Sequence, residues 1–362
     1  MFAARCEKLY EMMTEFGLDA LAVNAGPTLT YLSGFDFHLM ERPTVMVFVA
    51  GRRPTIILPE LEMKKLAGVE ESLRIFFYGE NPQSWGGVFT DALADLGLSG
   101  AKIGVEPGRM RLLEYSYLTK GMEEAQYPDG GELIARLRSR KDATEIGHMR
   151  DAVRIAEDAL EATLPMIRAG VTEKEIAAEL VINLFREGSD PELPFSPIVA
   201  GGPNGANPHA QPTERPLAEG DLIIIDWGAR YNGYCSDLTR TFGIGSVDEE
   251  SRKIHEFVLQ ANRAGRAAGG AGVPCAEVDR AARREIESGG YGDFFRHRTG
   301  HGIGMDCHED PYMHGENEQS LEIGMTYTVE PGIYLAGKNG VRIEDDVVVT
   351  ENGAESLSTM PR

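Results

Sequence analysis

The stretch LAEGDLIIIDWGARYNGYCSDLTRTF, residues 217–242, decides the fold of the second part of the chain. Its run 222–225 is apolar on both faces of a strand, which is typical of a buried strand, and the run ends in Asp226. The chain then returns in a second strand that carries Asp237. The stretch therefore predicts a hairpin with one acidic residue on each strand.

A second stretch, LEIGMTYTVEPGIYLAGKNGVRIEDDVVVT from residue 321, repeats this pattern. Each stretch opens with Leu-x-x-Gly and has an acidic residue six positions after the glycine, Asp226 in the first and Glu330 in the second. Each carries another acidic residue further on, Asp237 and Glu344. Since predicted helices precede both stretches, we expect a duplicated helix–hairpin unit whose halves meet around a pseudo-twofold axis. Chance similarity of two hairpins is the alternative.

These four acidic residues predict a metal site. Taken singly, each fits a turn residue, an ion-pair partner or a helix cap. A buried bare carboxylate is costly unless it is paired or bound to a metal, however, and two matched hairpins carry four of them. One divalent ion would leave such a pocket with two negative charges, whereas two ions neutralise it.

The nitrogen ligand expected beside the carboxylates is His301, in the run HRTGHGIGMDCHEDP at 297–311. Its neighbours Gly300, Gly302 and Gly304 allow the backbone to bend and to approach a ligand closely. A plain loop histidine among glycines is the alternative. Oxygen-rich ligation with one imidazole favours Mn, Co or Fe, and Zn stays open because of its general affinity. The sequence thus predicts two divalent ions, with Mn favoured.

The first part of the chain alternates predicted helices and strands, which indicates an α/β domain. The expected helices lie near 3–17, 59–67, 84–97 and 109–120, and the expected strands at 20–24, 45–50, 55–58 and 102–105. A Pro-Asp-Gly-Gly break at 128–131 leads into two helices split near 139–142, and we set the domain boundary between residues 126 and 127. Residues 127–362 combine the hairpins with helices near 173–187, 248–269 and 275–289, which predicts an α+β domain.

The bulk composition excludes several classes of protein. A length of 362 residues suggests two domains. The net charge of -21 repels phosphate backbones, so nucleic acid is not an expected partner. None of the four cysteines forms a CxxC pair, which argues against a disulfide framework and fits a reducing cytoplasm. The N-terminus lacks an apolar signal core, and no apolar run approaches the roughly 20 residues that span a bilayer. We expect a cytoplasmic protein without a membrane partner.

Taken together, these motifs resemble the pita-bread metallopeptidases: aminopeptidase P, Xaa-Pro dipeptidase (prolidase) and methionine aminopeptidase. The resemblance to the proline-specific branch is carried by NPHAQPTERPL (207–217), DWGARYNGYCSDLTRTF (226–242), HRTGHGIGMDCHEDP (297–311), VEPGIY (329–334) and GVRIEDD (340–346). The first domain also resembles this branch, as in YLSGF (31–35), whereas methionine aminopeptidases usually lack such a domain. The resemblance implies a pita-bread catalytic domain at 127–362 and a creatinase/prolidase-like scaffold and dimerisation domain at 1–126.

The resemblance also implies roles for single residues. The implied metal ligands are Asp226, Asp237, His301, Glu330 and Glu344. Implied contacts to substrate or transition state come from His209, His308 and Arg342, with His297 beside them. Structural roles stay open for three of these residues. Arg342 fits an anchor for a substrate carboxylate or a partner that orients Glu344 and its hairpin by ion pairing. His209 also fits a loop or core histidine, and His297 fits a brace of its loop through hydrogen bonds.

The function expected from the resemblance is hydrolysis of the Xaa-Pro bond at the N-terminus of dipeptides or short peptides, by a homodimer. A metal-bridging hydroxide would attack the scissile carbonyl, with His308 or His209 donating to the oxyanion and Glu330 moving the proton to the leaving nitrogen. Ectoine-type and creatine-type hydrolases, a sulfonium-propionate lyase and a non-catalytic peptide-binding module are the alternatives. The intact ligand set argues against the creatine-type enzymes and the binding module.

Other candidate residues have plainer interpretations. Cys235 and Cys307 are expected to be small packing residues. Trp227 and Tyr231 fit the pocket wall or the core, and the basic cluster at 136–141 fits a solvated helix face. Surface or capping roles are expected for His38, His148, His255 and His314.

Overall fold

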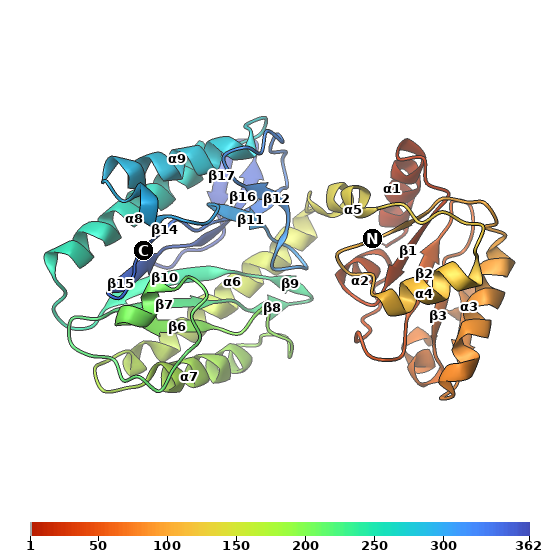
Figure 1. Ribbon diagram of the computed structural model, residues 1–362, viewed down its shortest axis with the longest axis horizontal. Coiled ribbons are helices and arrows are strands. Elements are labelled where there is room, and N and C mark those ends of the chain that lie inside the picture. Colours follow the sequence, from red (N-terminus) through yellow and green to blue (C-terminus); the bar gives the residue numbers. More distant parts are fainter. Residues whose placement is uncertain (1) are drawn as a thin grey trace. The chain divides into compact units, whose positions relative to one another are not determined.

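The computed structural model describes residues 2–362 and contains two compact units, one ending at Leu137 and the other spanning Arg138–Arg362 (Figure 1). The first unit is built on a mixed five-stranded sheet in the order β4-β3-β2-β1-β5. Its strands are β1 (Ala20–Asn24), β2 (Val45–Phe48), β3 (Thr55–Pro59), β4 (Arg74–Tyr78) and β5 (Ile103–Val105). Its helices are α1 (Phe2–Glu15), α2 (Pro27–Ser33), α3 (Pro82–Leu96) and α4 (Leu112–Gly121), with a 3-10 segment at Glu60–Leu66.

Most elements of the first unit were expected from the sequence, but β4 and α2 were not. Helix α2 is only seven residues long; it begins at Pro27 and ends before Gly34, whose φ of 79° is the left-handed cap that glycine supplies. Strand β4 is partly exposed at the edge of the sheet, so its side chains lack the buried pattern that marks the central strands. Both elements are short, and short elements give weak periodic signals.

In the second unit, two helices precede each of two sheets. Helices α6 (Ala143–Thr163) and α7 (Glu173–Arg186) lead into β6 (Ile198–Gly201), β7 (Leu222–Trp227) and β10 (Leu238–Gly243), and α5 (Gly131–Arg138) leads into this unit. Helices α8 (Glu249–Ala268) and α9 (Cys275–Ser288) lead into β11 (Gly300–Gly302), β12 (Glu309–Met313), β13 (Thr326–Val329), β16 (Asp345–Thr350) and β17 (Gly353–Ser356). Two small ribbons complete it: β8 (Arg230–Tyr231) with β9 (Tyr234–Cys235), and β14 (Gly332–Leu335) with β15 (Asn339–Arg342).

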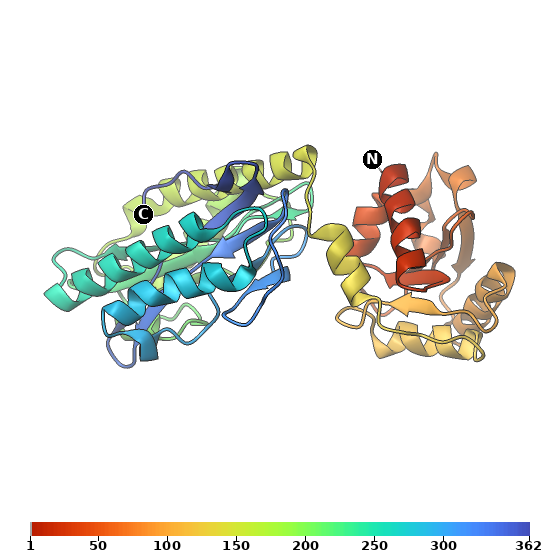
Figure 2. The same cartoon turned by 90° about the horizontal axis from the view of Figure 1, so that it is seen from above.

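The two helix pairs lie on opposite sides of the strands in both views of the second unit (Figures 1 and 2). Local signals start α6 and α7, since Asp142 and Thr172 each form a capping box with the glutamate three residues later. The halves join between β10 and the start of β16, where the Glu344 N–H donates to the Thr239 carbonyl at 3.1 Å. The expected combination of an α/β first domain and an α+β pita-bread domain is confirmed.

The interior of the second unit contains apolar clusters beside buried charged side chains. Trp227 is fully buried, and its indole N–H donates to the Ala156 carbonyl of α6 at 2.7 Å, so this side chain belongs to the core rather than to a pocket wall. Within residues 2–362, no helix combines the length and the apolar character that crossing a membrane would require.

Candidate metal centre

A cavity of about 720 Å³ lies in the second unit and is lined by residues of both halves. Its volume is within the range of sites that enclose a small molecule. All nine side chains that the sequence singled out for the site line this one cavity: His209, Asp226, Asp237, His297, His301, His308, Glu330, Arg342 and Glu344. Segments more than a hundred residues apart in the chain therefore converge here.

Strand ends and short strands position the five predicted ligands. Asp226 lies near the end of β7, and Asp237 directly precedes β10. His301 is the middle residue of β11, Glu330 directly follows β13, and Glu344 lies between β15 and β16. Each side chain therefore projects from backbone that sheet hydrogen bonds hold in place.

The ligand atoms form three overlapping groups, in each of which all atoms lie within 4.8 Å of one another. The groups are Asp237, His301 and His308; His301, Glu330 and Glu344; and Asp226, Asp237 and Glu344. Because three of the side chains belong to two groups each, ions bound in neighbouring groups would share ligands. Shared ligands are typical of two-metal sites.

The imidazole of His301 is held in the form that binds a metal. Its Nδ1 lies 3.1 Å from the Gly302 carbonyl, and a carbonyl can only accept, so Nδ1 carries the proton. The Nε2 lone pair then points at carboxylates, 3.4 Å from Glu330 Oε1 and 3.7 Å from Asp237 Oδ2. Burial lowers the pKa of His301 well below its usual value, which keeps the ring neutral. A lone pair facing carboxylate oxygens is repulsive unless a cation lies between them.

The carboxylates show the same need for a cation. Burial, reinforced by neighbouring carboxylates, raises the pKa of Asp237 and of Glu344 well above the ordinary values. Burial also raises the pKa of Glu330 to about 8. Asp226 Oδ1 is buried without a hydrogen-bond partner among residues 2–362. Divalent ions fit this donor set, because they would neutralise the carboxylates and occupy the unused oxygen.

Arg342 is already committed to the frame of the site. Its Nη2 donates to Asp226 Oδ2 at 2.6 Å and its Nε to Thr239 Oγ1 at 3.1 Å. Its Nη1 donates to the Tyr334 hydroxyl at 3.0 Å and to the Pro208 carbonyl, next to His209, at 3.2 Å. Four of its five N–H groups are therefore used, which favours the orienting role over the anchoring of a substrate carboxylate.

Residues 147–351 match the model of metallopeptidase family M24, and residues 5–140 match the creatinase/prolidase N-terminal domain. The chain belongs to the M24 metallopeptidases. As a member of this family it is a metal-dependent peptidase, so the carboxylate and imidazole cluster has divalent metal ions as its expected occupants.

Solved structures of M24 metallopeptidases resemble the chain over its whole length. A dipeptidase from Pyrococcus horikoshii is 38% identical with a TM-score of 0.92, and the match covers 99% of this chain and 98% of that one. A prolidase from Thermococcus sibiricus is 33% identical with a TM-score of 0.93, covering 100% and 98%. An Xaa-Pro dipeptidase from Bacillus anthracis is 31% identical with a TM-score of 0.90, covering 100% and 99%.

His297 of the M24 metallopeptidase is held by a hydrogen-bonded chain that starts at Arg342. Arg342 donates to the Tyr334 hydroxyl, which lies 2.9 Å from His297 Nε2, while His297 Nδ1 lies 2.7 Å from the Arg298 carbonyl. The carbonyl requires a proton on Nδ1, so Nε2 accepts from Tyr334. Both ring nitrogens are occupied, which makes His297 a brace for the loop. Tyr334 was not expected from the sequence.

The loop that carries His308 is anchored by two buried cations. Arg138 donates to Asp306 and to Glu309 at 2.7 Å each, and Lys141 donates to Glu309 at 2.5 Å. The expectation of a solvated face at 136–141 is therefore wrong for Arg138 and Lys141, which are each 6% exposed. Their partners lie more than 160 residues away in sequence, so no local pattern announces the burial. The anchored loop places the His308 ring 4.0 Å from that of His301.

Two further side chains that line the cavity, His314 and Arg298, were not expected there from the sequence. His314, for which a surface or capping role was expected, lines the cavity. Arg298 lines it as well, with its guanidinium 4.3 Å from the centre of the Tyr312 ring. Within residues 2–362, the Arg298 side chain has no ion-pair or hydrogen-bond partner. The signal that was available for Arg298 is its place inside the glycine-rich run, one residue after His297.

The two cysteines near the motifs differ in their surroundings. Cys235 is fully buried and its thiol donates to the Met305 carbonyl at 3.5 Å, as expected of a packing residue. The Cys307 thiol lies 3.1 Å from Asp237 Oδ2. Burial raises the pKa of Cys307 well above its usual value, so the thiol keeps its proton and donates to this carboxylate. Cys307 thus helps to orient a predicted ligand.

Proposed function

We propose that this M24 metallopeptidase is an Xaa-Pro dipeptidase that cleaves the bond between the N-terminal residue and proline. Two divalent ions would be held by Asp226, Asp237, His301, Glu330 and Glu344. The choice of proline rests on the relatives named prolidase and Xaa-Pro dipeptidase, which match over the whole chain. Those relatives and the complete ligand set do not favour the non-peptide substrates or the binding module.

The observation that carries the choice of dipeptides is the uncommitted guanidinium of Arg298 in the cavity. A dipeptide places a free carboxylate one residue beyond the scissile bond, and a guanidinium binds a carboxylate through paired N–H donors. Arg342 lines the same cavity, but its donors are bound to Asp226, Thr239, Tyr334 and Pro208. Arg298 is therefore the proposed partner of the substrate carboxylate.

The ions, once bound, supply Lewis acidity and lower the pKa of water. Glu330 is the proposed proton carrier to the leaving nitrogen, because its side chain is 16% exposed against 7% for Asp237. The His308 side chain lines the cavity and is accessible from it. Partial burial of the ring lowers the pKa of His308, so the imidazole is neutral. Its N–H group is therefore available to a developing oxyanion. His209 on the neighbouring loop is the second candidate donor.

Several finer points belong to the same proposal. Manganese is the favoured ion because four of the five proposed ligands are carboxylates, with Co, Fe and Zn as alternatives. A homodimer in which residues 1–126 form a scaffold and dimerisation domain follows from the family resemblance described above. A cytoplasmic location is proposed because the four cysteines form no CxxC pair and suggest no disulfide framework.

The test uses metal-stripped protein supplied in turn with Mn, Co, Fe and Zn. Substrates are Leu-Pro, Leu-Pro amide, Leu-Pro-Gly and Met-Ala. We expect Leu-Pro to be hydrolysed and the amide, which lacks the carboxylate, to have a kcat/KM about 10–100-fold lower, the range expected for losing one charged hydrogen-bonded pair. No cleavage of any Xaa-Pro peptide with any ion would refute the function, and equal rates on Leu-Pro and its amide would refute the dipeptide preference.

The variant Arg298→Ala separates the proposed carboxylate contact from the rest of the site. It should close the gap between Leu-Pro and its amide to within a few-fold. Arg296→Ala is the matched control: this exposed arginine lies two residues earlier, contacts the Asp293 carbonyl and does not line the cavity, so it should keep the gap. A gap that survives in Arg298→Ala would assign the carboxylate to another group.

A further inference from the structure

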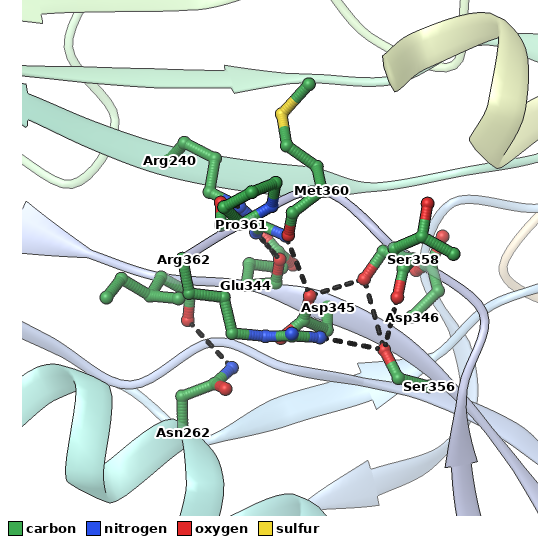
Figure 3. A network of polar contacts seen from close by, with 12 residues as sticks. Arg240, Asn262, Glu344, Asp345, Asp346, Ser356, Ser358, Met360, Pro361 and Arg362 are labelled. Carbon is green, nitrogen blue, oxygen red and sulfur yellow. Dashed lines mark hydrogen bonds and ion pairs between the residues drawn. The ribbon is translucent and has the colours of Figure 1, made fainter.

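Residues 356–362, which we call the strap, contact Arg240 of β10 and Asp345 at the start of β16 (Figure 3). Successive side chains of a strand point to opposite faces. Glu344 lines the cavity, and the buried Thr239 hydroxyl on the same side donates to Glu344 Oε2 at 2.7 Å. Their chain neighbours Arg240 and Asp345 therefore project from the opposite face, towards the strap.

Arg240 links the strap to a predicted ligand residue through a fully used guanidinium. Its Nε donates to the Pro361 carbonyl at 2.9 Å, and its Nη2 donates to the Met360 carbonyl and to Asp345 Oδ1 at 3.0 Å each. Its Nη1 donates to the carbonyls of Thr239 at 2.9 Å and Glu344 at 2.7 Å. All five N–H groups are satisfied, and the side chain is 2% exposed. The rigid planar group thus fixes the Glu344 backbone relative to the strap.

Asp345 receives a second set of contacts from the strap. Arg362 Nε donates to Asp345 Oδ2 at 2.6 Å, and the Ser358 hydroxyl donates to Oδ1. Arg266 of α8 approaches the same carboxylate at 3.4 Å and donates to Asn262 Oδ1 at 2.9 Å. Asp345 is fully buried and directly follows Glu344, so its position sets that of the ligand residue.

Further contacts extend this frame to both halves of the unit. Glu157 of α6 accepts from the Thr359 and Met360 backbone N–H groups at 2.6 and 2.7 Å, which ties the strap to the first half. Asn262 of α8 donates to the carbonyls of Val329 and Ile343, the residues directly before Glu330 and Glu344. The strap therefore closes a network that reaches the backbone of two predicted ligands.

The last four residues of the strap orient the site rather than fill a core. Leu357 is buried at 5% exposed and packs the start of the strap. Residues 359–362 bury no large apolar side chain, since Thr359 and Pro361 are exposed and Met360 and Arg362 are half-buried. Their contribution is directional, through carbonyls, N–H groups and one guanidinium. If these residues left, Arg240 would keep buried N–H groups without partners, and the penalty for an unsatisfied donor drives a local shift.

We propose that the strap is a positioning element of the metal centre, which holds Arg240 and Asp345 so that Glu344 and Thr239 keep the geometry that binds divalent ions. This inference rests on the proposed metal site. Partners behind metal ligands typically change metal affinity by about 10–100-fold when removed. Removing the strap should therefore weaken metal binding in a protein that is still folded.

The experiment is a calorimetric titration of Mn²⁺ into metal-stripped protein, with circular dichroism on each sample. A variant lacking residues 360–362 should bind Mn²⁺ about 10-fold more weakly than the wild type. Glu157→Ala removes three hydrogen bonds to the strap and Arg362→Ala removes two. Each should leave the circular dichroism spectrum unchanged and weaken binding about 3-fold, because the rest of the network still holds Arg240 and Asp345. Arg362→Lys keeps the charge and should recover part of the affinity.

The matched control is Arg150→Ala, which breaks an exposed ion pair with Glu355 next to the strap and should change the Kd less than twofold. Unchanged Mn²⁺ affinity in the protein lacking residues 360–362, in Glu157→Ala and in Arg362→Ala would overturn the strap proposal alone, provided that the wild type binds Mn²⁺. Absence of Mn²⁺, Co²⁺ and Zn²⁺ binding by the wild type would overturn the metal site and the strap proposal together. A loss of affinity equal in the control and the strap variants would also overturn it.

Discussion

Glu344 and Asp345 are neighbours in the chain, and both are buried, at 2% and 0% exposed. Their pKa values nevertheless move in opposite directions. Burial raises the pKa of Glu344, and Glu330 and Asp226 add to the effect. Burial also acts to raise the pKa of Asp345, but Arg240 and Arg362 outweigh it and bring the pKa below the usual value.

The difference shows that burial alone does not mark a metal ligand. Asp345 has its counter-charge built into the chain, in the form of three arginines within 3.4 Å. Within residues 2–362, the cavity-facing carboxylates of Asp226, Asp237, Glu330 and Glu344 have a single arginine ion pair, between Arg342 and Asp226. Arg298 lines the cavity but forms no ion pair with them. The missing positive charge on that face has to be bound from solution.

Replacing Glu344 by glutamine should break the comparison most severely. The variant removes a charge that two of the three ligand groups share, so we expect one fewer bound ion and a kcat/KM on Leu-Pro roughly 1,000-fold lower, equivalent to about 4 kcal/mol of transition-state stabilisation. Metal content by mass spectrometry and steady-state kinetics provide the measurements. Glu355→Gln, at an exposed position, is the control; an unchanged ion count in Glu344→Gln would contradict the ligand assignment.

Replacing Asp345 by asparagine tests the opposite face. It leaves Arg240 and its neighbours without a buried counter-charge, so the free energy of unfolding should fall by about 3 kcal/mol, as is common when one member of a buried ion pair is lost. Urea unfolding provides the measurement. Asp158→Asn, in an exposed pair with Arg154, should cost under about 1 kcal/mol. Equal losses in the two variants would mean that the arginines around Asp345 relax into solvent.

The pH dependence of the metal-stripped protein should sharpen the comparison by a smaller amount. Glu330 has a pKa of about 8 when folded against 4.5 in its ordinary state, so its contribution to stability is present below pH 4.5 and is lost as the pH rises towards 8. The shifts of Asp237 and Glu344 have the same sign. The Tm of metal-stripped protein should therefore fall between pH 5 and 8, by about 2–4 °C for each kcal/mol lost.

Metal-loaded protein should not show this fall, because bound cations stabilise the ionised carboxylates. Differential scanning fluorimetry with and without Mn²⁺ measures the gap at each pH. A gap that stays constant from pH 5 to 8 would show that these carboxylates do not carry the repulsion that the burial implies.

Local patterns predicted much of the fold because they reflect the backbone periodicity directly. The run 222–225, apolar on both faces, becomes β7, and the helices expected near 173–187, 248–269 and 275–289 become α7, α8 and α9. The acidic residues at strand ends followed from their matched spacing in two hairpins. Their convergence in one cavity needed the family resemblance as well, since spacing does not place Asp226 near Glu344.

The features that escaped prediction depend on partners far away in the sequence. The local sequence around Arg138 and Lys141 indicates surface cations, and only the tertiary structure shows that they are paired with Asp306 and Glu309. Arg298 and Arg342 are both arginines near motifs, and only the tertiary structure shows that one is committed and the other is not. Residues 356–362 carry no motif, and their role is visible only through the contacts to Arg240 and Asp345.

The first half of the second unit supplies Asp226 and Asp237, and the second half supplies His301, Glu330 and Glu344. Neither half contains all five predicted ligands. With the proposed ligands, both ions can be fully coordinated only after the two halves have packed together. Full metal binding therefore follows that packing step during folding. A chain cut between the two halves would bind the ions weakly. Activity is therefore expected only from chains in which both halves are folded and packed together.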